Sequence, residues 1–224
     1  WNGLKEGIYF ISGNRPILML LIMYCILEFI GAISFDGMFT PLLLARTNNN
    51  ETIVGIVSSF MAIGCIVASV ILSMMEQPKK KLPIMYFGSY MCLIGITLFG
   101  MGRNLVWWCI VVFIGCFGSP IYHTYQTIII REKVDASMQG RVFSLQGMIT
   151  QALTPLGFLG GGMLADYIFE PLMKKMFLGK NIITFFVGRQ NGSGIGLIFV
   201  IAGLVGIAAL TILKCNPAIK ELEQ

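Results

Sequence analysis

Charged residues are scarce in this sequence. Asp, Glu, Lys and Arg make up only 12% of its 224 residues, hydrophobic residues make up 56%, and the mean hydropathy is +0.79. A soluble globular chain carries about twice this charged fraction, because its surface must be covered by groups that water solvates. The shortage of charge therefore excludes an ordinary soluble domain and indicates a surface that faces hydrocarbon.

Histidine is nearly absent, and common catalytic motifs are missing. With one histidine, His123, the chain cannot form an HExxH zinc site. Gly179-Lys180 is followed by Asn181, so the phosphate-binding loop GxxxxGK[ST] is absent too. The six cysteines lie mostly in apolar runs without CxxC spacing, which predicts neither disulfides nor metal ligands. We therefore expect a protein that is not an enzyme and has no cofactor.

No basic stretch interleaved with aromatic residues is present, so nucleic-acid binding is not expected. The chain starts at Trp1 rather than at a methionine, and we expect its true start to lie upstream. Residues 1–15 read as a polar lead-in rather than as a cleavable signal peptide.

Long hydrophobic runs dominate the rest of the chain. A bilayer core about 30 Å thick needs about 20 apolar residues per spanning helix. Helices are expected because every backbone N–H must find a partner without water. The spans are predicted at about 16–44, 53–75, 82–102, 105–130, 142–166 and 194–213. The sequence thus predicts an all-α membrane protein, with a six-helix bundle over 16–214 and a tail over 215–224.

The placement of basic residues predicts the orientation. Of the 16 Lys and Arg residues, ten fall in the end segments and the connections on their side, and six fall in the opposite connections. The set of ten is Lys5, Arg15, Lys79, Lys80, Lys81, Arg131, Lys133, Arg141, Lys214 and Lys220. Basic residues concentrate in cytoplasmic loops, so both termini are predicted to be cytoplasmic.

The last connection, about 167–193, would then lie outside. Its Leu172, Met173, Met176 and Phe177 share one helical face. This pattern is typical of an interfacial amphipathic helix, and equally of a loop that packs on the bundle.

Carboxylates inside a span are the costliest feature of the sequence. Glu28 lies about 12 residues into the first span, near mid-membrane. An acidic group there costs several kcal/mol unless it is protonated, paired or hydrated. Asp36 lies eight residues further on, near Gly31 and Gly37, where the helix could break. Both are candidates for proton binding, and the alternative is a buried carboxylate that only holds helices together.

Polar side chains also mark the fourth span. His123 lies beside Tyr122 and Gln126, after Pro120, which should kink the helix and free a carbonyl. His123 and Glu28 differ in depth by one or two turns, so they could meet and form a proton-coupling pair. A structural, hydrogen-bonded histidine is the alternative. Tyr122 and Gln126 are candidates for contact with substrate.

A polar stripe runs along the fifth span. Gln146, Thr150 and Thr154 recur every four residues and share one face. This face should point at other helices or at a cavity, so Gln146 and Thr150 are candidate cavity residues. The glycines that follow Pro155 favour close helix packing.

Residues 135–144, DASMQGRVFS, are similar to a stretch between the tenth and eleventh helices of major facilitator superfamily exporters, particularly the macrolide-efflux-like branch. Residues 162–172 and 216–223 also resemble that branch. The resemblance implies that the six spans are helices seven to twelve, the C-terminal half of the fold, built from two three-helix inverted repeats.

The resemblance also implies roles for residues. Helices seven, eight, ten and eleven line the family's cavity, which places Glu28, His123 and Thr150 there. Asp135, Gly140 and Arg141 would contribute gating contacts at the cytoplasmic mouth. The loop with Lys79, Lys80 and Lys81 would be a degenerate basic motif, since it lacks the usual Gly-x-x-x-Asp lead.

These observations predict half of a proton-coupled exporter of small amphipathic molecules in the bacterial plasma membrane. The proton gradient would supply the energy, and the expected partners are the bilayer, a small-molecule substrate, and an N-terminal six-helix half or a second copy. Import is not excluded, because direction is not written in these residues. The alternative is a membrane module that does not transport.

Overall fold

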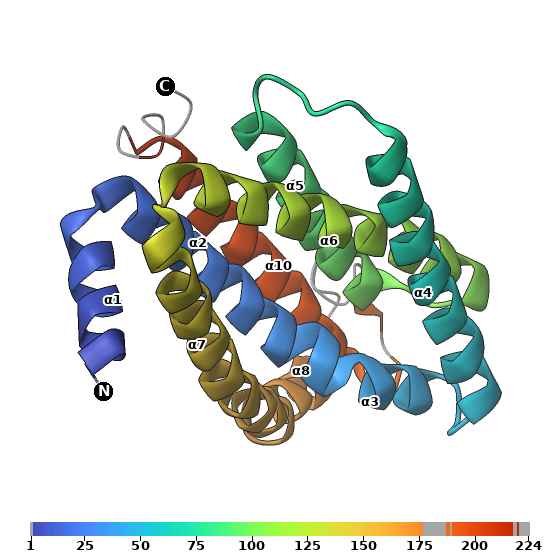
Figure 1. The fold of residues 1–224 in the computed structure, drawn as a ribbon. Helices are drawn as coiled ribbons and strands as arrows, with labels where there is room; N and C mark the ends of the chain where they lie inside the picture. Colours follow the sequence, from blue (N-terminus) through green and yellow to red (C-terminus); the bar gives the residue numbers. More distant parts are fainter. Residues whose placement is uncertain (1, 177–186, 189, 217–218, 220–224) are drawn as a thin grey trace.

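The computed structural model describes residues 2–176, 187–188, 190–216 and 219, and the described residues contain helices and no strands (Figure 1). The elements, in chain order, are α1 (Asn2–Gly13), α2 (Arg15–Gly31), η1 (Ala32–Asp36), α3 (Gly37–Arg46), α4 (Glu51–Met74), α5 (Leu82–Met101), α6 (Leu105–Lys133), α7 (Ala136–Met163), η2 (Leu164–Phe169), α8 (Glu170–Met176) and α10 (Ser193–Lys214). Both η elements are π-helical.

Six helical segments are long and apolar enough to cross a membrane. They are Arg15–Arg46, Glu51–Met74, Leu82–Met101, Leu105–Lys133, Ala136–Met173 and Ser193–Lys214. The predicted all-α fold with six spans is therefore confirmed. Asparagines begin three of them: the side chains of Asn14, Asn50 and Asn104 accept hydrogen bonds from the first-turn N–H groups of Ile17, Thr52 and Trp107.

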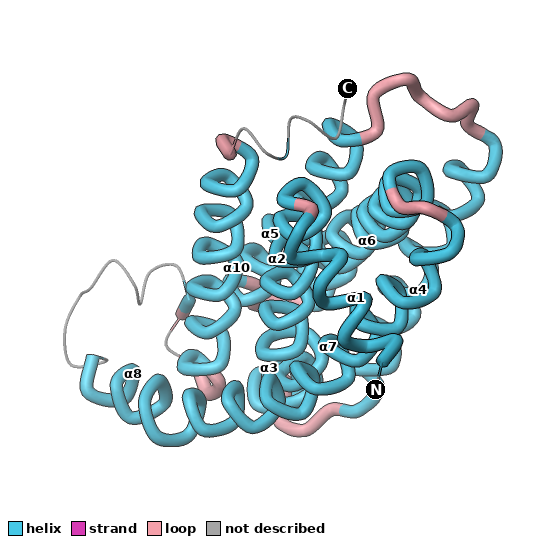
Figure 2. The backbone as a smooth tube through the Cα atoms, turned by 60° about the vertical axis from the view of Figure 1, so that its left-hand side comes forward, coloured by secondary structure: helices cyan, strands magenta, loops and turns pink. Residues whose placement is uncertain are grey.

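The connections alternate between the two ends of the bundle. The α1–α2 junction, the α4–α5 connection, the α6–α7 junction and the end of α10 lie at one end, at the top of Figure 1. The views in Figures 1 and 2 agree on this arrangement. It is the grouping that the basic residues predict; the assignment of this end to the cytoplasm stays a prediction.

Two segments expected to be irregular are helical. The charged stretch 131–141 was expected as a connection, and this is wrong: α6 continues to Lys133 and α7 begins at Ala136. The Gln139 side-chain amide donates to the carbonyls of Arg131 and Val134, at 2.9 Å each, and so caps the end of α6. The polar stretch therefore does not mark where these two helices end.

Residues 1–15 were expected to be a polar lead-in, but most of them form helix α1. α1 packs against α7 with Gly7 and Ile11, and Ile11 is buried. Likewise the first ten residues of the last connection continue the fifth span as helix. There Met173 is fully buried while Leu172 is exposed, which favours packing on the bundle. The side chain of Met176 and residue Phe177 lie outside the described part.

The first span remains helical across its expected break. α2, η1 and α3 follow one another from Arg15 to Arg46, and the π-helical segment lies between Gly31 and Gly37. Gly157 of α7 packs against this segment: a Cβ built on it would lie 2.5 Å from the Cβ of Ala32. A π-helical segment shifts the register of the following turn, and such segments occur often at functional sites.

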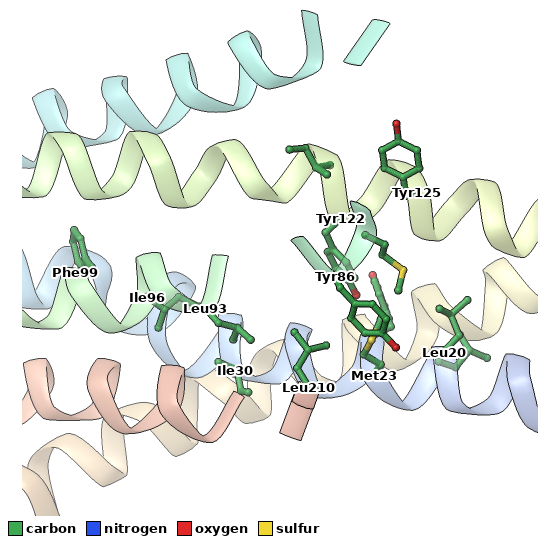
Figure 3. Close-up of a cluster of buried hydrophobic side chains, with 14 of the residues drawn as sticks. Leu20, Met23, Ile30, Tyr86, Leu93, Ile96, Phe99, Tyr122, Tyr125 and Leu210 are labelled. Carbon is green, nitrogen blue, oxygen red and sulfur yellow. The ribbon is translucent and has the colours of Figure 1, made fainter. Parts of the chain in front are cut away.

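α5 is the central helix of the remaining bundle, between α6 and α10. Gly95 of α5 and Gly115 of α6 face each other so closely that a Cβ on Gly95 would lie 2.6 Å from the Cα of Gly115. Figure 3 shows Leu93 of α5, Ile30 of α2 and Leu210 of α10 meeting in the apolar interior. The helix backbones thus approach each other at glycines, as in other membrane bundles.

Pro120 lies inside α6 without interrupting it. A proline has no backbone N–H to donate, so it leaves the carbonyl of the residue four positions earlier without its helical hydrogen bond. This is Cys116, and its carbonyl accepts a hydrogen bond from the Cys65 thiol of α4 at 3.4 Å. All six cysteines are free thiols.

The Arg46 side chain joins three segments at the end of the bundle that lies opposite the α4–α5 connection. Its guanidinium donates to the carbonyl of Gly102, to that of Gly100 at 2.9 Å and to that of Val187 at 3.1 Å. The first two carbonyls belong to the end of α5, which has no further helical N–H groups to satisfy them. One side chain therefore joins the first span, α5 and the segment before α10.

We expect Arg46→Ala to lower the free energy of unfolding by about 3 kcal/mol, because each hydrogen bond to a charged donor contributes about 1.5–3 kcal/mol. Arg46→Lys should lose less, since it keeps the charge but not the planar fork. Thermal unfolding of purified protein in detergent measures the difference. Lys79→Ala, at an exposed position at the other end of α5, serves as the control; equal melting temperatures for Arg46→Ala and wild type would refute this role of Arg46.

Candidate functional site

The structure brings together the two residues that the sequence singled out for proton coupling. Glu28 lies on α2 and His123 on α6, and His123 Nε2 is 3.7 Å from Glu28 Oε1. The Glu28 side chain is 24% exposed and that of His123 is 47% exposed. The expectation that the two could meet is confirmed. The separation is an ion-pair distance and is longer than a direct hydrogen bond, so a small movement or one water molecule can change the contact.

Aromatic rings surround the pair. Tyr122 lies 4.8 Å from the His123 ring, between centroids. Tyr24, one turn before Glu28 on α2, stacks on Tyr122 at 6.3 Å and meets the His123 ring edge-on at 6.2 Å. Figure 3 shows Tyr122 directed from α6 toward the interior, near Tyr86. These rings limit the directions from which water can reach the carboxylate and the imidazole.

The polar stripe of α7 joins the same site. Thr150 Oγ1 donates to Tyr24 Oη at 3.1 Å and is also 3.1 Å from the carbonyl of Gln146. Thr154 instead bonds the carbonyl of Thr150 at 2.9 Å, within its own helix. Thr150 therefore reaches the cluster around Glu28, whereas Thr154 has only this local bond among the described residues.

Three polar side-chain atoms near this cluster are buried and have no hydrogen-bond partner among the described residues: Tyr122 Oη, Gln126 Nε2 and Gln146 Oε1. Tyr122 and Gln126 are 4% and 1% exposed. A buried polar atom without a partner costs about 1–3 kcal/mol, so such atoms normally bind water or a ligand. Among the predicted substrate-contact residues, Gln126 thus supplies a hydrogen-bond donor and Gln146 an acceptor. A polar ligand between the helices would pair with them.

Asp36 is more peripheral. It is the last residue of η1, it is exposed, and among the described residues no basic side chain forms an ion pair with it. The structure does not bring it to His123.

The candidate gating residues lie at the α6–α7 junction. Arg141 Nη1 forms an ion pair with Glu6 Oε2 of α1 at 2.6 Å. The backbone carbonyl of Asp135 accepts from the N–H groups of Met138 and Gln139, at 2.8 and 3.1 Å, and so begins α7. Gly140 has open space where a side chain would lie. Nearby, Lys81 at the start of α5 pairs with Glu132 at the end of α6.

Sequence reasoning missed Tyr24 and Glu6. Tyr24 lies four residues before Glu28 and so shares its helical face, a spacing that could have identified it. Glu6 was missed because its partner, Arg141, is distant in the chain and α1 was not expected to fold back on α7.

These features define a multi-pass helical membrane protein with a partly exposed polar site between its helices. No protein-family model matches the chain, and no solved structure matches it. Curated relatives from two bacterial species carry one name, macrolide efflux protein A. Macrolide efflux protein A of Streptococcus pyogenes is 23% identical over 167 residues, which cover 74% of this chain and 41% of that protein.

Macrolide efflux protein A of Enterococcus faecalis is 23% identical over 156 residues, which cover 69% of this chain and 48% of that protein. The chain thus spans between two fifths and half of the length of the relatives it matches. The resemblance to macrolide-efflux-like exporters is confirmed as a weak similarity to proteins that are named for macrolide efflux.

Proposed function

We propose that this chain is one six-helix lobe of a proton-coupled exporter of small amphipathic molecules, with the major facilitator fold. The observation that carries the proposal is the contact between Glu28 and His123 inside the spans, beside buried polar atoms without partners. Ionisable groups inside a membrane are costly and usually serve ion or substrate movement.

In the proposed cycle Glu28 binds a proton when the cavity is open to the outside. Protonation of Glu28 removes the negative charge that attracts a protonated His123, so the α2–α6 contact can loosen. When the cavity opens to the cytoplasm Glu28 releases the proton. Asp36, further along the first span, is the second candidate for proton binding in this cycle.

Substrate would contact the neutral polar groups beside this pair. Gln146 and Thr150 of α7, with Tyr122 and Gln126 of α6, offer donors and acceptors among aromatic surfaces. Such a mixture suits an amphipathic molecule, which buries apolar area and satisfies a few hydrogen bonds. The relatives are named for macrolide efflux, so macrolides are the first substrates to test.

Alternating access requires a second lobe. The relatives are about twice the length of the matched region, and α4 and α7 expose large apolar side chains such as Ile66 and Leu159, at 61% and 66%. We assign these faces to lipid and to a second six-helix lobe, either an N-terminal half or a second copy. The ten-to-six bias of basic residues supports the proposal that both termini face the cytoplasm of a bacterial cell. Asp135, Gly140 and Arg141 would then lie at the cytoplasmic mouth.

The test is uptake of a radiolabelled macrolide by bacteria that lack their own exporters and express the complete transporter, this chain together with its second lobe. We expect accumulation to fall on expression and to return to the level of control cells when a protonophore collapses the gradient. Accumulation that is lowered but insensitive to the protonophore would refute proton coupling. If a panel of amphipathic compounds shows no change in accumulation at all, the chain is a membrane module that does not transport.

A further inference from the structure

Tyr24 contacts both parts of the proposed site but belongs to neither. Its ring on α2 meets the His123 ring edge-on at 6.2 Å, one turn from Glu28, and its hydroxyl is 3.1 Å from Thr150 Oγ1 on α7. The residue is 8% exposed, so its side chain has little freedom to move alone. It is therefore a direct physical link between the proton site and the polar stripe of α7.

The hydrogen bond of Tyr24 can reverse its direction. Thr150 has one hydroxyl proton and two acceptors at the same distance of 3.1 Å, Tyr24 Oη and the carbonyl of Gln146. If Thr150 donates to Gln146, the Tyr24 hydroxyl can donate to Thr150. If Thr150 donates to Tyr24, the tyrosine proton is left for a third partner. A substrate that takes a hydrogen bond from either hydroxyl selects one arrangement.

The ring of Tyr24 would transmit the change between these two hydrogen-bond arrangements to His123. It stacks on Tyr122 with an interplanar angle of 24°, and Tyr122 in turn lies 4.8 Å from His123. A displacement of the Tyr24 ring therefore changes how the imidazole faces Glu28, whose contact at 3.7 Å is loose enough to respond. Packed interiors pass on such displacements because they contain little free volume.

Among the described residues, the titratable groups near this pair include Tyr24, Cys25 and Asp36 on the first span, Tyr122 on α6, and Tyr86 and Cys92 on α5. The facing stretch of α7 contributes only neutral groups, among them Gln146 and Thr150. A change in α7 thus reaches the proton site through Tyr24 and not through a charge of its own.

We propose that Tyr24 is a positioning residue that couples substrate contact on α7 to proton binding at the Glu28–His123 pair. The inference rests on the proposed function. Tyr24 neither binds the proton nor supplies the main substrate contacts. Its role is to make proton binding at Glu28 and substrate contact on α7 depend on each other. Such coupling is reciprocal: substrate on α7 changes the proton affinity, and the proton changes the affinity for substrate.

Tyr24→Phe tests the inference, because it removes the hydroxyl and keeps the ring. In the complete transporter we expect the pH of half-maximal efflux to shift by about 0.7 pH unit, the size expected for losing one hydrogen bond of about 1 kcal/mol. Thr150→Val should shift it in the same direction. The double variant should shift it no further than either single variant, since both remove the same link.

Tyr90→Phe is the matched control. Tyr90 of α5 forms the same kind of hydroxyl pair, with Thr211 of α10 at 3.0 Å, and neither residue is part of the proposed site. It should leave the pH profile unchanged even if it lowers the melting temperature. If Tyr24→Phe lowers the melting temperature but keeps the wild-type pH profile, Tyr24 is only structural and the inference is overturned.

Glu28→Gln, run in parallel, separates the two proposals. If it abolishes proton-driven efflux while Tyr24→Phe leaves the pH profile unmoved, only the inference about Tyr24 fails. If Glu28→Gln exports normally, the proposed function itself fails and no shift in Tyr24→Phe can be assigned to that pair.

Discussion

Replacement of Glu28 by Gln is expected to reduce proton-driven efflux by about tenfold or more, equivalent to a loss of about 1.4 kcal/mol or more in the coupled step. Gln has nearly the shape of Glu but cannot bind and release a proton, and it has no charge to attract His123. Expression and melting temperature should remain at the wild-type level or rise slightly, because a neutral amide is less costly inside a membrane than a carboxylate. The measurement is macrolide uptake into everted vesicles, whose outer face is the cytoplasmic one, under an imposed pH gradient.

Glu51→Gln provides the control for this experiment. Glu51 is exposed in the first turn of α4, near the opposite end of the bundle from the α4–α5 connection, so the same chemical change occurs away from the polar site. Efflux by Glu51→Gln should equal that of the wild type. Unchanged gradient dependence in Glu28→Gln would remove this carboxylate from the mechanism, whatever its contact with His123.

A second large effect is expected on stability. Gly95→Val should lower the free energy of unfolding by about 3 kcal/mol, at the upper end of the usual cost of overpacking. A Cβ at this position would lie 2.6 Å from the Cα of Gly115, and backbone atoms cannot rotate away. The two helices must separate, which also loosens their packing against neighbouring side chains. Thermal unfolding in detergent, with the yield of folded protein, measures the loss.

Gly55→Val is the matched control for that substitution. Gly55 also lies within a helix, α4, but a Cβ there would meet no atom within 4 Å. Both changes carry a similar cost in helix propensity, so their difference reports helix contact alone. If Gly55→Val and Gly95→Val melt at the same temperature, close backbone contact between α5 and α6 does not stabilise the bundle.

The part of the site that could be predicted follows from depth in the membrane. Glu28 and His123 lie in apolar runs of known length, so their heights could be counted along each helix, and their contact followed once α2 and α6 proved to be neighbours. The link through Tyr24 and Thr150 could not be predicted in the same way. It depends on how α2 and α7 are rotated about their own axes, which the hydropathy of either span leaves open.

The same holds for two segments that the sequence suggested as interruptions of helices. Gly31 and Gly37 suggested a break in the first span, but a π-helical segment keeps its hydrogen bonds and remains buried against α7. Residues 131–141 suggested a loop, but Gln139 caps α6 and two residues suffice to join it to α7. In both cases, backbone groups found partners that the local sequence does not reveal.

The sequence by itself determined that this protein has six apolar helices long enough to cross a membrane. It did so because transfer of a side chain into hydrocarbon depends on that side chain and its near neighbours in the chain. The tertiary structure alone decided which helices touch and in what rotation. It set the Arg46 hydrogen bonds across 54 to 141 residues of chain and the meeting of Tyr24, His123 and Thr150. Those contacts arise from packing between helices that are remote in sequence, and packing is a property of the whole bundle.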